Sequence, residues 1–273
     1  MNVPPTPEPV PPAPPPDVEL AACRARLAAL QREMDAFTYA VAHDLRAPLR
    51  AVTGFLDALR EDHSRDLPPA GQSYLLRAIE VSARAQRMLE ALLRLNRLAQ
   101  QPLDRRPTPL GEIADQVRRE AMRAAAGRDV RWQVGALPEV FADRRLLHEA
   151  LGQLVANALK FTRNCPCATI ELRVEEGAQG QVFSVRDNGA GFNAAAAANL
   201  GEPFARFHGQ QEFDGIGAGL AITLRILRRH GGRLWAESRE GEGATFYFTL
   251  ASEADGGRDA EVSPSENREE RER

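Results

Sequence analysis

The sequence predicts two structural parts, a long helical hairpin followed by a mixed α/β domain. Apolar residues recur at alternating spacings of three and four within residues 18–61, which is typical of a helix with one apolar seam. Pro68 and Pro69 separate this helix from a second one. From residue 110 onward, short apolar stretches alternate with helical patterns, which indicates helices packed against a sheet.

The apolar seam of the first helix needs partner helices to bury it. Two antiparallel helices bury too little apolar surface to be stable alone. We therefore expect residues 18–100 to form a dimerisation domain, in which two copies of the hairpin build a four-helix bundle with two-fold symmetry. The alternative is a monomer whose hairpin folds back on the second domain. The seam consists of Leu27, Leu30, Met34, Phe37 and Val41.

The remaining boundaries follow from composition. Residues 1–17 are mostly proline and residues 252–273 are mostly charged, so we expect both tails to be disordered. Residues 101–109 contain Pro102 and Pro107 and are expected to be a linker. The domain at 110–251 is expected to hold helices at 111–126, 144–163 and about 219–230, and strands at 130–134, 139–142, 169–174, 182–186, 233–238 and 244–250.

Bulk composition narrows the function classes. A net charge of −3 gives the chain no general attraction to nucleic acid or anionic membranes. No apolar run approaches the ~20 residues that span a bilayer, and no signal-peptide pattern opens the sequence. Three cysteines, Cys23, Cys165 and Cys167, form no disulfide framework. We therefore expect a cytoplasmic protein without nucleic-acid partner, membrane insertion or a four-ligand zinc site at Cys165 and Cys167.

The stretch from Phe37 to Arg50 carries a potential nucleophile. His43 is followed at once by Asp44, and a neutral imidazole nitrogen is nucleophilic near pH 7. The neighbouring carboxylate can hold the ring tautomer and accept a proton. Pro48 lacks an N–H, so the carbonyl of Asp44 loses its helical partner and the helix is expected to bend there.

One face of the helix at residues 144–163 is polar and the other is apolar. On a helical projection the polar stripe is about 80° wide, and it offers amide, carboxylate and amine groups. The pattern alone favours a solvated surface over a binding face. The stripe comprises Glu149, Gln153, Asn157 and Lys160, and the opposite face comprises Leu147, Leu151, Leu154 and Ala158.

Two glycine-rich stretches follow in the C-terminal half. Asp187 ends a strand and is followed by Gly189 and Gly191, where a carboxylate can accept a hydrogen bond from an amine and glycines admit close approach. Residues 214–222 open a helix with Gly215, Gly217 and Gly219, and N–H groups at a helix start can bind phosphate.

These stretches together resemble the conserved boxes of sensor histidine kinases, especially phytochrome-like ones. Residues 37–50 resemble the H-box, 154–162 the N-box, 187–192 the G1 box, 202–208 the F-box and 214–222 the G2 box. The resemblance covers residues 30–250. It implies a dimeric histidine kinase whose hairpin is followed by an ATP-binding α/β sandwich of the GHKL (Bergerat) type. Residues 193–214 would form the lid over the nucleotide.

The resemblance also implies site residues and partners. His43 would accept the γ-phosphoryl group of ATP, with Asp44 as its orienting base, and pass it to an aspartate on a separate response-regulator receiver. A separate sensor protein or a longer chain would supply the signal. The implied binding roles are Asn157 for Mg²⁺, Lys160 and Arg206 for phosphates, Asp187 with Gly189 and Gly191 for adenine, and Gly215, Gly217 and Gly219 for phosphates.

The sequence departs from the family pattern at a few positions. Gln153, Ile216 and Ala218 stand where asparagine, a hydroxyl residue and a larger apolar residue are usual. They leave open a non-catalytic dimeric scaffold, while another GHKL-type ATPase is the second alternative. Ala47 replaces the usual threonine or asparagine four residues after the histidine, so we expect weak phosphatase activity towards the receiver.

Overall fold

The structure is a computed structural model that describes residues 16–177, 180–193, 200–204 and 215–252. Arg206, most of the expected lid and nearly all of the two expected tails lie outside the described residues.

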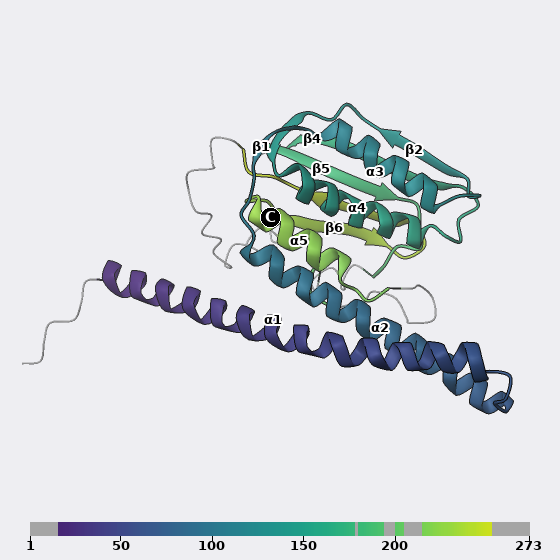
Figure 1. Cartoon of the computed structure of the whole chain (residues 1–273). Helices are drawn as coiled ribbons and strands as arrows, with labels where there is room; N and C mark the ends of the chain where they lie inside the picture. Colours follow the sequence, from purple (N-terminus) through teal and green to yellow (C-terminus); the bar gives the residue numbers. More distant parts are fainter. Residues whose placement is uncertain (1–15, 178–179, 194–199, 205–214, 253–273) are drawn as a thin grey trace, which may run out of the picture.

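The predicted helical hairpin is confirmed. Helix α1 spans Pro16–His63 and runs through Pro48 as one helix, and helix α2 spans Pro69–Gln100. Pro68 precedes α2 in an extended conformation, with another proline in the first turn, as the missing N–H of proline favours. The two helices pack against each other near their connection, and α2 leads towards the α/β domain (Figure 1).

Polar side chains join the two helices of the hairpin. The Thr53 hydroxyl lies 2.7 Å from the Ser82 hydroxyl, and Gln86 Nε2 donates to Thr53 Oγ1 at 2.8 Å. Nearer the α/β domain, Asn96 Nδ2 donates to the backbone oxygen of Asp35 at 2.5 Å. Because Ser82 and Asn96 are buried, these hydrogen bonds satisfy groups that would otherwise destabilise the hairpin.

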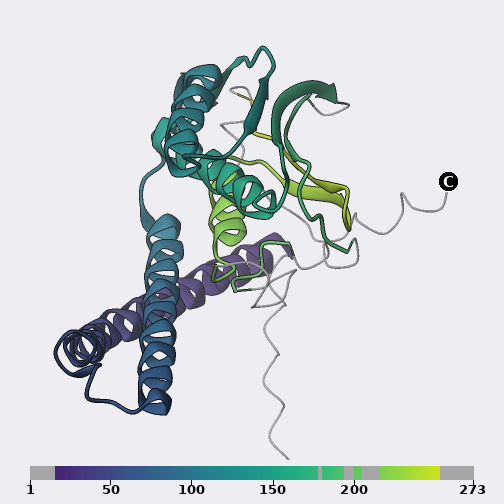
Figure 2. The ribbon, with the colours of Figure 1, turned by 90° about the vertical axis from the view of Figure 1, so that its right-hand side faces the viewer.

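The second part is a sheet covered on one face by helices. Figure 2 shows helices α3 (Leu110–Ala124), α4 (Arg144–Phe161) and α5 (Gly219–Arg229) on the same side of the sheet. The strand order is β2-β4-β5-β7-β6, in which only the β2–β4 pair is parallel. The strands are β2 (Val130–Val134), β4 (Ala168–Gly177), β5 (Gly180–Asp187), β6 (Leu234–Arg239) and β7 (Gly243–Phe248).

One segment that we expected to be linker forms a strand. Strand β1 (Arg106–Pro109) pairs antiparallel with β3 (Glu139–Ala142) in a separate two-stranded sheet. Thr108 is buried, and its hydroxyl donates to the backbone oxygen of Ala142 at 3.1 Å. Prolines are tolerated because a two-stranded sheet has only edge strands. The prolines of this segment therefore suggested a linker, whereas its strand conformation depends on pairing with β3, which is distant in the sequence.

The polar and apolar faces predicted for α4 are confirmed. Leu147, Leu151, Leu154 and Ala158 are at most 2% exposed and belong to the main core. The inward side chains of β4, β5 and β7 complete that core, among them Ile170, Val185 and Phe246. Burial of this apolar face fixes which side of α4 remains open to a ligand.

A buried histidine ties the start of α4 to the end of α5. His230 Nδ1 donates to the Ile226 oxygen at 2.8 Å, which leaves Nε2 to accept from the Asp143 backbone N–H at 3.0 Å. Burial lowers the pKa of His230, which favours this neutral form. Asp143 in turn caps α4 by accepting from Arg145 N and Leu146 N, so the two helices beneath the candidate site are held together.

Among the described residues, no helix has the length and apolar character needed to cross a membrane.

Candidate active site

The potential nucleophile lies on α1, within the hairpin. His43 is exposed, and its Nδ1 lies 3.4 Å from Asp44 Oδ1. The ring also stacks with Tyr39, with centroids 6.1 Å apart. Because helix geometry places residues 39 and 43 on one face, Tyr39 limits the orientations open to the imidazole. The described contacts leave Nε2 facing away from the paired carboxylate.

The polar face of α4 adjoins the glycine-rich start of α5. A Cβ added at Gly219 would lie 2.6 Å from Gln153 Oε1, and one added at Gly215 would lie 3.2 Å from Lys160 Nζ. Lys160 Nζ also sits 4.3 Å from the ring centroid of Phe161. Asn157 is partly exposed on the same face. The structure thus brings together the N-box and G2-box residues that are separated by about 60 positions in the chain.

A buried carboxylate stands at the end of β5. Asp187 is 3% exposed, and its Oδ1 accepts from the backbone N–H of Gly189 at 2.8 Å. Burial raises the pKa of Asp187 to about 6, while backbone donors at Gly189 and Ala244 oppose this shift. A buried carboxylate with residual acceptor capacity is suited to an amine donor.

The turn after Asp187 packs tightly on the C-terminal end of α4. A Cβ added at Gly189 would lie 2.6 Å from the Phe161 oxygen, to which Ala190 N donates at 3.1 Å. Gly191 has a φ of 61° and contacts the backbone near Arg239. Only glycine fits at such close approaches, so these positions fix the turn next to the carboxylate.

The G2 segment is shaped by left-handed glycines. Gly215 and Gly217 have φ values of 133° and 74°. The Gly217 oxygen accepts from Phe204 N at 3.1 Å, which joins the described end of the F-box to the G2 box. Ala218 precedes α5 without a side-chain cap, so the first N–H groups of that helix have no capping side chain and can bind an anion.

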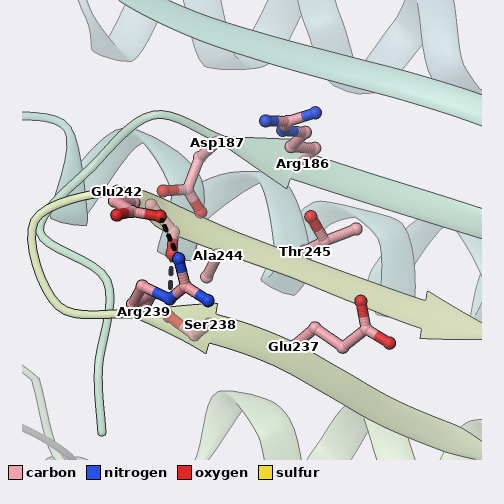
Figure 3. Close-up of a pocket in the computed structure, with 9 residues that line it drawn as sticks. Arg186, Asp187, Glu237, Ser238, Arg239, Glu242, Ala244 and Thr245 are labelled. Carbon is pink, nitrogen blue, oxygen red and sulfur yellow. Dashed lines mark hydrogen bonds and ion pairs between the residues drawn. The ribbon is translucent and has the colours of Figure 1, made fainter. Parts of the chain in front are cut away.

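A hollow of about 330 Å³ opens at the ends of β5, β6 and β7. Figure 3 shows Asp187 at its edge, with Arg239 and Glu242 paired beside it. Among the described site residues only Asp187 lines this hollow, whereas Asn157 and Lys160 do not. The hollow is therefore a neighbouring surface feature and is distinct from the α4–α5 face.

One contact between the hairpin and the α/β domain could not be predicted from the sequence. The guanidinium of Arg94 on α2 binds the Glu149 carboxylate on α4 through two hydrogen bonds, one of them 2.7 Å long from Nε. Leu95 and Leu98 of α2 pack beside this pair against α4 and α5. Glu149 thus belongs to the junction between the hairpin and the α/β domain, while Gln153 and Lys160 of the same stripe lie beside the G2 glycines.

Two family models match this chain. The model described as His Kinase A (phospho-acceptor) domain matches residues 33–101. The model described as histidine kinase-, DNA gyrase B-, and HSP90-like ATPase matches residues 142–254. The first covers the hairpin with His43, and the second covers the α4–α5 face and the G1 turn.

Named relatives agree with these models. Cyanobacterial phytochrome B of Nostoc sp. is 34% identical over 85% of this chain and 31% of its own length. The phosphate regulon sensor protein PhoR of Pseudomonas aeruginosa is 32% identical over 86% of this chain and 54% of its own length. The chain therefore spans about a third to a half of the length of these two relatives.

A solved structure shares the arrangement. Full-length ShkA in complex with AMPPNP aligns with a TM-score of 0.56 and 28% identity, over 79% of this chain and 46% of that one. The histidine kinase AdeS of Acinetobacter baumannii, at 19% identity and a TM-score of 0.52, shares the fold. With both domain models in order and kinase relatives across most of its length, the chain belongs to the sensor histidine kinase family.

Proposed function

We propose that this chain phosphorylates itself on His43 with ATP and transfers the phosphoryl group to an aspartate of a separate receiver protein. The observation that carries the proposal is that the polar face of α4 adjoins the G2 segment, while the G1 turn beside the buried Asp187 packs on the C-terminal end of the same helix. This ligand face is combined in one chain with an exposed histidine beside a carboxylate. The functional units would be residues 18–100 and 110–251, joined at residues 101–109.

His43 is proposed as the nucleophile. With the Nδ1 proton directed towards Asp44, whose carboxylate lies 3.4 Å away, the Nε2 lone pair is free to attack. Attack forms an N–P bond to the γ-phosphorus, and the bond to the bridging oxygen breaks with its electron pair leaving on the β-phosphate. Asp44 then takes the Nδ1 proton as the ring becomes a phosphorylated, neutral imidazole.

The phosphates would lie along the α4–α5 face. Lys160 provides a cation beside Gly215, and the uncapped start of α5 provides N–H donors and a favourable dipole. Arg206 is a further proposed phosphate ligand, and Gly217 and Gly219 would let the backbone approach. Asn157 would hold Mg²⁺ through its side-chain oxygen, and that ion neutralises phosphate charge when bound.

The adenine would be read by Asp187. Its carboxylate is buried and fixed by the Gly189 N–H, while Gly189 and Gly191 keep the adjoining turn free of side chains. An exocyclic amine donating to this carboxylate would replace part of the hydration that burial removed. Burial raises the pKa of Asp187 to about 6, so a donor to this carboxylate would favour its ionised form.

We further propose that the hairpin forms a homodimer. Phe37 and Met34 of the seam are each 65% exposed in the single chain, and Phe55 is 77% exposed. Exposed apolar residues continue along α2 at Tyr74, Leu76 and Val81. Exposed apolar residues on two adjacent helices are best covered by a second copy, which gives the four-helix bundle.

The test is incubation of the purified chain with Mg²⁺ and γ-labelled ATP. We expect label that acid removes and alkali spares, and its loss in His43→Gln. The matched control is His63→Gln, because His63 lies on the same helix, is similarly exposed, and has a carboxylate at the same 3.4 Å distance. The control should be labelled as strongly as the unmodified chain.

Other outcomes point to the alternatives. ATP binding without label would indicate a scaffold. ATP hydrolysis that His43→Gln leaves intact would indicate another GHKL-type ATPase. Transfer is tested by adding a purified receiver protein to the labelled chain, from which the label should move to the receiver. Slow loss of receiver phosphate in the presence of the unlabelled chain would agree with the alanine at position 47.

A further inference from the structure

Two cysteines lie on the loop between α4 and β4, directly beneath the G1 turn. Cys165 and Cys167 are free thiols of intermediate exposure, and Pro166 separates them. The proposed phosphoryl transfer uses neither thiol. Cys23, the third cysteine, is exposed on α1 and lies in the other part of the molecule.

The loop is bonded to a single residue of the G1 turn. Cys165 Sγ donates to the Asn188 backbone oxygen at 3.3 Å, and Asn188 Nδ2 donates to the Cys167 oxygen at 3.0 Å. Asn188 Oδ1 accepts from Thr169 N at 2.8 Å, just beyond the cysteine pair. Asn188 is therefore held by three hydrogen bonds, two with the loop that carries the thiols and one with the start of β4.

Asn188 stands between the two residues that define the carboxylate site. Asp187 precedes it, and Gly189, whose N–H binds the Asp187 carboxylate, follows it. Gly189 packs against the end of α4 with no space for a side chain. Because this turn is closely packed, a shift of the cysteine loop would be transmitted to the Asp187 carboxylate.

We propose that Cys165 and Cys167 form a reversible disulfide that weakens nucleotide binding by displacing the G1 turn. The effect on ATP rests on the proposed function of the Asp187 site. The formation of the bond and the displacement of the turn do not depend on it.

The sequence spacing permits the bond. Residues two apart can bring their Cα atoms within the ~4.4–6.8 Å that a disulfide requires when the chain bends between them, and the chain bends at Pro166 and Cys167. Small exposed disulfides of this type are readily reduced and serve as labile, regulatory bonds. In reducing compartments, transient redox-sensing disulfides are the usual kind.

The oxidant is a low-molecular-weight disulfide. The thiolate of one cysteine attacks a sulfur of that molecule, which forms a mixed disulfide and releases one small thiolate. The second cysteine thiolate attacks the protein sulfur of the mixed disulfide, closes the Cys165–Cys167 bond and releases the second small thiolate. Two electrons pass to the small disulfide, and the two protein thiol protons end on the two released thiols.

Bond formation removes the Cys165 S–H that now donates to the Asn188 oxygen. We expect the dissociation constant of a non-hydrolysable ATP analogue to rise about tenfold, the factor that corresponds to ~1.4 kcal/mol and to the loss of about one hydrogen bond. Reduction should restore the original value.

The experiment uses the full chain with Cys23→Ser, treated with oxidised glutathione and then compared with its reduced form. Peptide mass spectrometry should show the peptide with both cysteines lacking two hydrogens. Calorimetry measures the analogue affinity, and amide hydrogen exchange of residues 187–191 is measured without nucleotide. The matched control adds Cys165→Ser, whose hydroxyl can still donate to Asn188 but cannot form the bond, so its affinity should not respond to the treatment.

Two results would overturn the proposal: mixed glutathione disulfides without the internal bond, or an internal bond that changes neither affinity nor exchange. If the reduced chain binds no ATP analogue, the proposed function fails. In that case, faster exchange of residues 187–191 in the oxidised chain would still support a coupling between the disulfide and the G1 turn. Unchanged exchange would reject that coupling together with the proposed function.

Discussion

The hairpin and the α/β domain differ in how far their apolar side chains are buried. In the α/β domain, the leucines of α4 are almost completely buried against the sheet, with Leu154 at 1% exposure. In the hairpin, the seam of α1 stays open, with Phe37 at 65% exposure. The α/β domain therefore closes its core within one chain, whereas the hairpin leaves apolar residues exposed, which we propose are buried by a second copy.

The largest expected effect breaks the hairpin's association. Phe37→Asp places a charge in the seam of both copies and removes about 1.5–3 kcal/mol of burial from each. We expect the dimer dissociation constant to rise at least ~100-fold, as measured by sedimentation velocity. Ala36→Asp adds the same charge on a face of α1 away from the seam and should leave the dimer intact. Equal effects of both variants would argue against the seam as the interface.

The next effect concerns the core of the α/β domain. Leu154→Ala should lower the free energy of unfolding by about 2–5 kcal/mol at any protein concentration, because it opens a cavity in a closed core. Leu30→Ala, in the seam, should have an effect that depends on protein concentration. Both tryptophans, Trp132 and Trp235, lie in the α/β domain, so their fluorescence reports on that domain during unfolding. A concentration-dependent Leu154→Ala effect would contradict this contrast.

A pH dependence is expected from the buried carboxylate. Since the folded pKa of Asp187 is raised to about 6, its protonation stabilises the folded state at low pH, and this contribution is lost as pH rises through about 6. If Asp187 accepts from the adenine amine as proposed, ATP needs its ionised form, so affinity should fall about fivefold between pH 6 and pH 5. Calorimetry across this range measures it. Asp187→Asn should bind weakly with no such pH dependence, and a variant that retains the dependence would assign it to another group.

The smallest effect lies where the two parts meet. Arg94 and Glu149 are each about a quarter exposed, at 27% and 23%, so their paired hydrogen bonds are partly screened. A double-mutant cycle with Arg94→Ala and Glu149→Ala should give a coupling energy of about 1 kcal/mol in the free energy of unfolding. A coupling energy near zero would mean that the apolar contacts of Leu95 and Leu98 alone hold this junction.

Several features were predictable because they depend on local order in the chain. The seam spacing and Pro68–Pro69 placed both helices to within two residues. The projection of residues 144–163 separated the buried leucines of α4 from Gln153, Asn157 and Lys160. The helix expected at about 219–230 is α5, and Gly231 follows its end in the left-handed region. Periodicity, proline and glycine act through the backbone, so they leave a readable signal.

Other features were missed because their partners are distant in sequence. Strand β1 lies in a proline-containing stretch, and only its pairing with β3 makes it a strand. Arg94 is one of many surface-like arginines until the fold places Glu149 beside it, 55 positions later. Asn188 is one letter of a common turn motif, and its bonds to the cysteine loop depend on the folded turn.

The sequence by itself determined the order of the parts, the faces of the helices, and the family, because residue type and spacing carry all three. The tertiary structure alone decided that the polar face of α4 meets the start of α5 and that Asp187 is buried. It also decided that the loop with Cys165 and Cys167 forms hydrogen bonds with Asn188. These results depend on which surfaces remain open after the core has closed, and packing between distant segments settles that outcome.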